Sequence, residues 1–440
     1  MTADRSAGTT GVLPLAPSGL VLSPFRALRY DTAVAGPLAH LTSPPYDVMN
    51  VDGVAALESA SNHNVVRLIL PRPGPGEPDR YRHAARLLAD WRATGALRPD
   101  PVAALYVYEQ SDPVTGDAQR GLLGALALSP AEDAIVLPHE ATMAGPVADR
   151  LALYSAVQAD LEPIFLVYDG GGPATQAVAN VRDSEAVVDL TLPDGLRHRL
   201  WALTDPDLLA AIAADLHPRV AVIADGHHRY ATYLQRQREA HAAGAGAGPW
   251  DAGLSFLVDA QTFGPQVHPI HRVIPGIEVH ELVNRSSGGI VVHDLDGNDL
   301  DSALEALALA GLGGPAFLLV SGDGGTIRLL ESPDPARLRR ALPTERSDAW
   351  KALDVVVLHH YLVTELWEIP DTVETVGYEH DLHAALAMAD RTGGTAVLLN
   401  PTPVAAVTAV AGGGEQMPRK STLFTPKPRT GLVLRDHRDW

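Results

Sequence analysis

Residues 219–248 read RVAVIADGHHRYATYLQRQREAHAAGAGAG, and this stretch decides the fold. Residues 220–224 form a short apolar run that predicts a buried strand, and the residues from His228 onward favour a helix. Between them, Asp225 can cap the helix, and Gly226 allows a sharp turn or the close approach of a ligand. A strand, a tight turn and a helix in succession are the building unit of α/β and α+β proteins.

The charge of this turn points to a ligand. His227, His228 and Arg229 put up to three cationic groups at the positive end of the helix dipole, which is unfavourable unless an anion is bound there. The first N–H groups of a helix bind phosphate, and an arginine adds a bidentate contact. We therefore predict a phosphate site at Gly226, His227, His228 and Arg229. The alternative is that both histidines are neutral and only pack or cap.

The rest of the chain alternates between strand and helix patterns, which predicts an α/β or α+β fold with mixed sheets. Strands are expected at 63–71, 103–110, 120–128 and 162–169, and a hairpin at 186–203. Helices are expected at 81–95 and at 205–216, the second capped by Asp205. We expect a flexible leader at 1–20, an N-terminal α/β domain at 21–275 that carries the turn, a smaller α/β domain at 276–400, and a basic arm at 401–440 that folds back on the site.

Composition narrows the class of protein. The chain has 440 residues, of which 46% are hydrophobic, so it can bury a core and is not disordered by composition. Its formal net charge of −19 argues against nucleic acid as a partner. It has no cysteine, which excludes disulfides and thiolate sites. No apolar run is long enough for a membrane span, so we expect a cytoplasmic protein without a membrane partner.

Only three of the 34 basic residues are lysines, and two of these, Lys420 and Lys427, lie in the segment MPRKSTLFTPKPRTG at 417–431. Three prolines make this arm rigid and non-helical. A lysine can hold a phosphate as a point charge during transfer. The alternative is a solvated basic tail.

Three other motifs carry candidate residues. LPHEATMAGPVADR at 137–150 contains Glu140, a candidate general base, and Arg150, a candidate ligand contact; the alternative is a solvated loop with a helix cap. In HPIHR at 268–272 the proline favours an extended or turn segment, which leaves Arg272 as the phosphate candidate; the alternative is a structural turn. SPPYDV at 43–48 places Asp47 just after a Pro-Pro turn, and by itself the motif indicates only a turn.

One more charge lies in an apolar segment. Arg67 of NVVRL is expected inside the strand at 63–71, where a buried charge must be paired. A carboxylate is the expected partner, ahead of a bound anion.

The motifs PPYDV, NVVRL, PHEATMAGPVADR, PIFLVY, IADGHHRY, HPIHR, LLNPTP and MPRKSTLFTPK together resemble the family known as domain of unknown function 1015, over about residues 24–432. The turn at 225–229 also resembles the phosphate-binding turn of the ParB/sulfiredoxin superfamily, most of all that of free-serine kinases. This second resemblance implies a site for nucleotide phosphates and magnesium. The absence of any cysteine argues against sulfiredoxin chemistry.

These observations favour a phosphotransferase that uses ATP or ADP with Mg²⁺ and acts on a small hydroxyl metabolite such as serine. Asp225 would hold the metal, Lys420, Lys427 and Arg229 would neutralise the transferring group, and Glu140 or Asp47 would take the hydroxyl proton. Two alternatives stay open: a nucleotide-binding switch without catalysis, and a metal-dependent phosphatase built on His227, His228 and Asp225. The oligomeric state, a homodimer included, also stays open.

Overall fold

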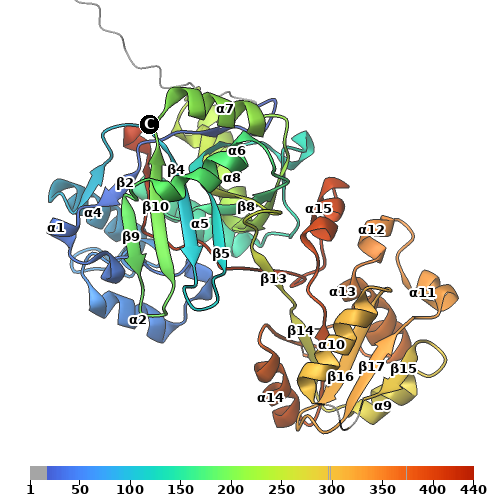
Figure 1. The fold of residues 1–440 in the computed structure, drawn as a ribbon. Helices are drawn as coiled ribbons and strands as arrows, with labels where there is room; N and C mark the ends of the chain where they lie inside the picture. The colour runs from blue at the N-terminus through green and yellow to red at the C-terminus, as the bar shows by residue number, and fades with distance from the viewer. Residues whose placement is uncertain (1–16, 296, 298, 373) are drawn as a thin grey trace, which may run out of the picture. The chain divides into compact units, whose positions relative to one another are not determined.

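The computed structural model describes residues 17–295, 297, 299–372 and 374–440. Most of the leader expected at 1–20 lies outside these residues. The chain forms two compact units, one of the described residues up to Pro265 with Pro426–Trp440, and one of Gln266–Thr425 (Figure 1). The expected arm at 401–440 is therefore divided between the units. Residues 271–274 belong to the second unit because they pair with strands at 377–379 and 395–399.

The first unit is built on a nine-stranded sheet, in which β1 (Leu22–Ser23) pairs beside the main path. The path runs β6 (Val136–Leu137), β11 (Ala221–Asp225), β8 (Ile164–Tyr168), β12 (Ala252–Asp259), β5 (Ala118–Ala127), β4 (Leu105–Ser111), β10 (Arg197–Leu203) and β9 (Val188–Thr191). The pairs β11–β6 and β12–β8 are parallel and the others are antiparallel, so the sheet is mixed. The prediction of a mixed α/β fold is confirmed.

Helices and short pairs complete this unit. The helices are α1 (Thr32–Ala35), α2 (Val51–Ala60), α3 (Val66–Ile69), α4 (Arg80–Ala93), α5 (Ala144–Val157), α6 (Pro173–Asn180), α7 (Pro206–Leu216) and α8 (His227–Ala242). The short pairs join β2 (Leu28–Tyr30) to β3 (Leu97–Pro99) and β7 (Ala159–Asp160) to β21 (Arg435–Asp436). One core joins sheet residues such as Leu166 and Ile223 to Leu88 of α4, Leu153 of α5 and Tyr233 of α8.

Most of the predicted elements are confirmed, including the hairpin of β9 and β10 and the capping of α7, where the Asp205 carboxylate accepts the Leu208 N–H at 2.8 Å. The strand predicted at 63–71 is wrong, because α3 lies there. The Asn64 side chain accepts the Val66 N–H at 2.9 Å and starts the turn. Arg67 donates to two backbone carbonyls, those of Ser61 and Glu58, rather than to the carboxylate expected.

The second unit has its own six-stranded antiparallel sheet. Its order is β15 (Val291–Asp294), β17 (Ile327–Glu331), β16 (Ala316–Ser321), β19 (Thr395–Leu399), β14 (His271–Ile274) and β18 (Gly377–Glu379). Residues of α10 (Leu300–Gly311) and α14 (Leu382–Thr392) share one core with alternate residues of these strands, so both helices cover one face of the sheet.

The second unit also contains further helices and one short strand pair. They are α9 (Val279–Arg285), α11 (Pro335–Ala341), α12 (Asp348–Lys351), α13 (Asp354–Val356), a π-helix (Val357–Leu366), α15 (Val404–Gly412) and the pair β13 (Gln266–His268) with β20 (Leu423–Thr425). A π-helix is rare, and π-helical turns are often found at functional sites.

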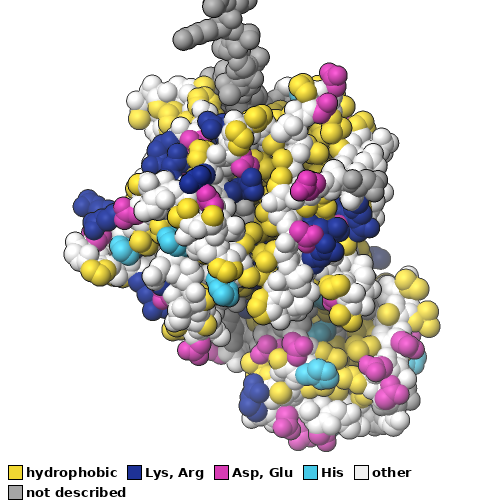
Figure 2. Space-filling model, turned by 60° about the vertical axis from the view of Figure 1, so that its left-hand side comes forward, with side chains coloured by type: hydrophobic (Ala, Val, Ile, Leu, Met, Phe, Trp, Pro, Cys, Tyr) yellow, Lys and Arg dark blue, Asp and Glu magenta, His cyan; other side chains and the backbone are white. Residues whose placement is uncertain are grey.

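On the face drawn in Figure 2, lysine and arginine side chains stand beside aspartate and glutamate side chains. Across the described ranges, no helix has both the length and the apolar character that crossing a membrane requires.

Candidate functional site

The turn between β11 and α8 follows a strand that is paired on both of its edges. β11 pairs in parallel with β6 and antiparallel with β8, with a register shift between Ile223 and Asp225. Gly226 follows with φ 96°, a left-handed conformation that favours glycine, and it is the N-cap of α8. No side chain caps this helix among the described residues, so its first N–H groups lack the usual partner.

Asp225 does not cap α8, so that part of the prediction is wrong. Its carboxylate is held by two cations instead: Oδ1 lies 2.5 Å from Lys427 Nζ, and Oδ2 accepts from Arg229 Nη2 at 2.6 Å. Burial raises the pKa of Asp225, but Arg229 and Lys427 outweigh burial and lower it overall. The carboxylate therefore stays ionised at the end of β11.

Lys427 links this turn to the loop that carries Asp47. Its ammonium group ion-pairs with Asp47 Oδ2 as well as with Asp225, and its side chain is 14% exposed. Burial lowers the pKa of Lys427, but the two carboxylates raise it above its ordinary value. We call Lys427, Asp225 and Asp47 the lysine–carboxylate cluster.

Two arginines lie behind this cluster in the interior. Arg229 is buried and donates to the Pro163 carbonyl as well as to Asp225. Arg150 is buried too, donates to the Ile69 carbonyl at 2.7 Å and pairs with Asp149 at 2.6 Å. Both guanidinium groups are thus engaged by the protein, which explains their burial without a ligand.

The surroundings of both histidines in the turn disfavour a cationic ring. Burial, followed by the proximity of His139, lowers the pKa of His227 well below its ordinary value, and burial also lowers that of His228. The lowered pKa values of both histidines favour less positive charge in the first turn of α8 than the sequence suggested, and Asp225 balances the charge of Arg229.

Glu140 lies beside this turn. Its Oε2 is 3.8 Å from His227 Nδ1, and its side chain is 44% exposed. The structure thus brings together Glu140, Asp47, Asp225, Gly226, His227, His228, Arg229 and Lys427, with Arg150 behind them.

Sequence reasoning missed Glu162, which is fully buried next to the same loop. Its Oε1 accepts the Tyr46 N–H at 3.0 Å, and its Oε2 lies 3.9 Å from Arg150 Nη1. Burial raises the pKa of Glu162 above its ordinary value. A glutamate directly before the apolar run of β8 was the available signal, because a charge at such a place needs partners.

Arg272 and Lys420 belong to the second unit. The Arg272 guanidinium is buried, donates to His359 Nε2, to the Ile270 carbonyl and to the Lys420 carbonyl, and stacks on the Tyr378 ring. His359 in turn bonds Asp371 through Nδ1 at 3.0 Å. Lys420 is exposed and has φ 52°. Within this unit, Arg272 holds the backbone that presents Lys420.

The residues at the turn do not fit the resident magnesium ion that the sequence suggested. Each Asp225 oxygen already faces a cation, and the ammonium of Lys427 stands between Asp225 and Asp47 where an ion would share their charge. The described part of the chain holds no group of three or more histidine, aspartate or glutamate side chains placed to bind a metal.

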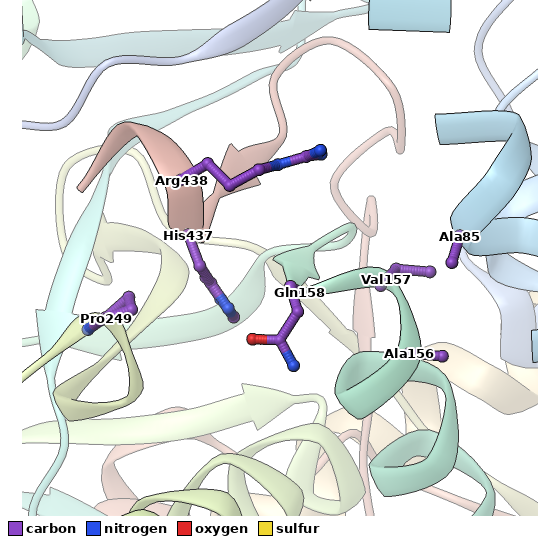
Figure 3. A pocket seen from close by; sticks show the side chains of 7 residues that line it. All are labelled: Ala85, Ala156, Val157, Gln158, Pro249, His437 and Arg438. Carbon is purple, nitrogen blue, oxygen red and sulfur yellow. The ribbon is translucent and has the colours of Figure 1, made fainter. Parts of the chain in front are cut away.

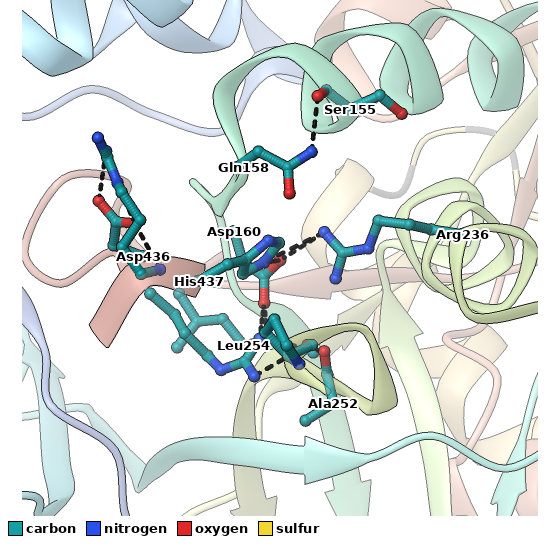
Figure 4. A network of polar contacts seen from close by, with 12 residues as sticks. Ser155, Gln158, Asp160, Arg236, Ala252, Leu254, Asp436 and His437 are labelled. Atoms are coloured by element: carbon teal, nitrogen blue, oxygen red, sulfur yellow. Dashed lines mark hydrogen bonds and ion pairs between the residues drawn. The ribbon is translucent and has the colours of Figure 1, made fainter. Parts of the chain in front are cut away.

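A second polar region of the first unit surrounds Asp160, which is fully buried (Figure 4). Its Oδ2 accepts from Arg435 Nη1 at 2.8 Å, while its Oδ1 bonds His437 Nε2 at 2.9 Å and lies 3.4 Å from Arg236 Nη1. Beside it lies a pocket of about 310 Å³ (Figure 3). The pocket is lined by Ala85, Ala156, Val157, Gln158, Pro249, His437 and Arg438, none of which belongs to the turn at 225–229.

Comparison with solved structures finds proteins that are only weakly similar to this chain. A free serine kinase in complex with ADP has a TM-score of 0.34 at 13% identity, over 69% of this chain and 90% of its own. SbnI from Staphylococcus aureus with a C-terminal truncation has a TM-score of 0.34 at 11% identity, over 71% of this chain and 87% of its own. A conserved hypothetical protein from Pyrococcus furiosus has a TM-score of 0.31 at 15% identity, over 69% of this chain and 94% of its own.

No curated protein matches the sequence. Residues 22–356 match the family described as "Protein of unknown function (DUF1015)", as the sequence motifs predicted. The chain therefore belongs to this family of proteins of unknown function.

Proposed function

We propose that the protein binds a nucleotide at the N-terminus of α8 and transfers its terminal phosphoryl group to the hydroxyl of a small metabolite such as serine. The observation that carries the proposal is the lysine–carboxylate cluster, which holds the ammonium of Lys427 beside the uncapped first turn of α8. A helix N-terminus with an adjacent lysine is a favourable place for phosphate oxygens.

The groups have separate roles in this proposal. The N–H groups of His227, His228 and Arg229 bind the phosphates, and the left-handed Gly226 lets the backbone approach them. Lys427 neutralises the charge that spreads over the transferring group. Asp225 and Asp47 hold the ammonium in place before the ligand arrives.

Glu140 is the proposed base. It takes the proton of the acceptor hydroxyl while the hydroxyl oxygen bonds the terminal phosphorus and the bond from that phosphorus to the bridging oxygen breaks. The products are the phosphorylated acceptor and the nucleotide shortened by one phosphate. Serine is the acceptor to test first, because the turn at 225–229 resembles that of free-serine kinases.

The test is calorimetry with ATP and ADP, followed by product detection with serine as acceptor in a buffer containing Mg²⁺. We expect binding in the micromolar to millimolar range and a phosphorylated amino acid as product. Glu140→Gln should retain binding and lose about 10²-fold or more in kcat. The absence of nucleotide binding at millimolar ligand would overturn the proposal, and binding without turnover would reduce it to a nucleotide switch.

A further inference from the structure

The segment that carries Glu140 is bound to α8 through both histidines of the turn. The His139 N–H donates to His227 Nε2 at 3.3 Å, and the Met143 N–H donates to His228 Nε2 at 3.0 Å. These bonds fix the two ends of residues 139–143, which connect β6 to α5. Glu140 lies between the two fixed points.

The direction of these bonds determines the tautomer of each ring. A backbone N–H only donates, so Nε2 of both histidines must carry a lone pair and the ring proton must stand on Nδ1. On His227, this proton faces Glu140, whose Oε2 is 3.8 Å from Nδ1. His227 therefore has one nitrogen bound to the segment and the other directed at the carboxylate.

The surroundings favour this arrangement over a cationic ring. His139 stacks edge-on against His227 with ring centroids 4.5 Å apart, and Arg229 and Lys427 add positive charge nearby. Three carboxylates act in the opposite direction: Glu140 faces His227, and Asp47 and Asp225 raise the pKa of His228, but burial outweighs them. Protonation of Nε2 on either ring would remove the acceptor that its backbone donor needs.

We propose that His227 and His228 are positioning residues that hold residues 139–143, and with them Glu140, against the N-terminus of α8. The proposal rests on the proposed function only for the role of Glu140 as base. The clamp itself is a statement about two hydrogen bonds, and it can be tested without any substrate.

The first test uses ¹⁵N NMR of the histidine rings in the ligand-free protein at pH 7.5, where we expect the Nδ1–H tautomer for both His227 and His228. This tautomer is the less common one for a free histidine, so its signature identifies the bonds. The Nε2–H tautomer on either ring, or a cationic ring, would overturn the proposal for that residue.

The second test compares two amide variants of His228 that differ in length. A glutamine places an amide oxygen near the position of Nε2, whereas an asparagine is too short to reach it. We expect His228→Asn to lower the hydrogen-exchange protection of the Met143 amide about tenfold and His228→Gln to restore most of it. Equal protection in the two variants would overturn the clamp, and circular dichroism checks that both are folded.

The third test connects the clamp to the reaction. If turnover is found, His228→Asn should lower kcat more than it changes the KM for nucleotide, and His228→Gln should recover at least half of the rate. An unchanged kcat in His228→Asn would overturn the positioning role. If no turnover is found but the NMR and exchange results hold, the clamp stands and the proposed function alone fails.

Discussion

Asp160 and Asp225 are two carboxylates of the same unit, and both receive cations from the segment Pro426–Trp440. Asp160 is completely enclosed, and its partners include two rigid guanidinium groups. Asp225 shares a flexible lysine with Asp47, whose side chain is 36% exposed. The enclosed network is placed to stabilise the fold, whereas the lysine–carboxylate cluster puts a partly exposed ion pair at a helix N-terminus without a side-chain cap.

The enclosed network should give the largest effect on stability. Asp160→Asn leaves Arg435, Arg236 and His437 around a neutral amide, and removing one partner from a buried ion pair costs about 3–5 kcal/mol. Urea denaturation followed by circular dichroism measures the loss. A change below about 1 kcal/mol would show that Asp160 is no more important to the fold than an exposed carboxylate.

The lysine–carboxylate cluster should instead give the largest effect on ligand binding. Lys427→Ala removes the only ammonium at the turn among the described residues and leaves Asp47 and Asp225 as neighbouring like charges. We expect nucleotide affinity to fall at least tenfold, and kcat by about 10²–10³-fold if turnover is found.

The control for this variant is Lys351→Ala. Lys351 belongs to the second unit and donates to the Thr344 carbonyl at 3.3 Å. It should bind nucleotide like the wild type by calorimetry. Equal loss in both variants would mean that general charge, rather than the cluster, attracts the ligand.

Acidification should destabilise the first unit through two buried histidines, His139 and His198. Burial lowers the pKa of His139 to about 4 and that of His198 to about 4. The unfolded chain takes up these protons below about pH 6.5 while the native protein does not, so the free energy of unfolding falls as the pH drops from 6.5 toward 4. Between pH 7 and 5, we expect a loss of about 1–2 kcal/mol per histidine in urea denaturation. A stability that is constant over this interval would contradict the neutral state of these rings.

The sequence predicted the local parts of the site but not their partners. An apolar run followed by Asp-Gly and a polar segment is enough to predict β11, the turn and α8. The pairing of Lys427 with Asp47 spans 380 residues, and no local pattern contains it. Asp225 was expected to cap α8 because aspartate is a common N-cap, but two cations brought by tertiary contacts engage its carboxylate.

The same limit explains the strand that was wrongly predicted at 63–71. Val65, Val66, Leu68 and Ile69 are all buried, and a short apolar run without a visible period fits a buried helix turn as well as a strand. The Asn64 side chain decides between them by accepting the Val66 N–H. Its own amide donates to the carbonyls of His40 and Thr42, contacts that exist only once the chain has folded.

The smallest effect should come from Asp47, and it separates the two candidate bases. If Asp47 only restrains Lys427, Asp47→Asn weakens one partly exposed ion pair, costs at most about 1 kcal/mol of stability, and leaves the ammonium freer to meet a phosphate. Nucleotide affinity measured by calorimetry should then stay equal or rise a few-fold, with any kcat within about threefold of wild type. If Asp47 were the base, kcat would fall about 10²-fold or more while affinity stayed the same, and Glu140 would lose its proposed role.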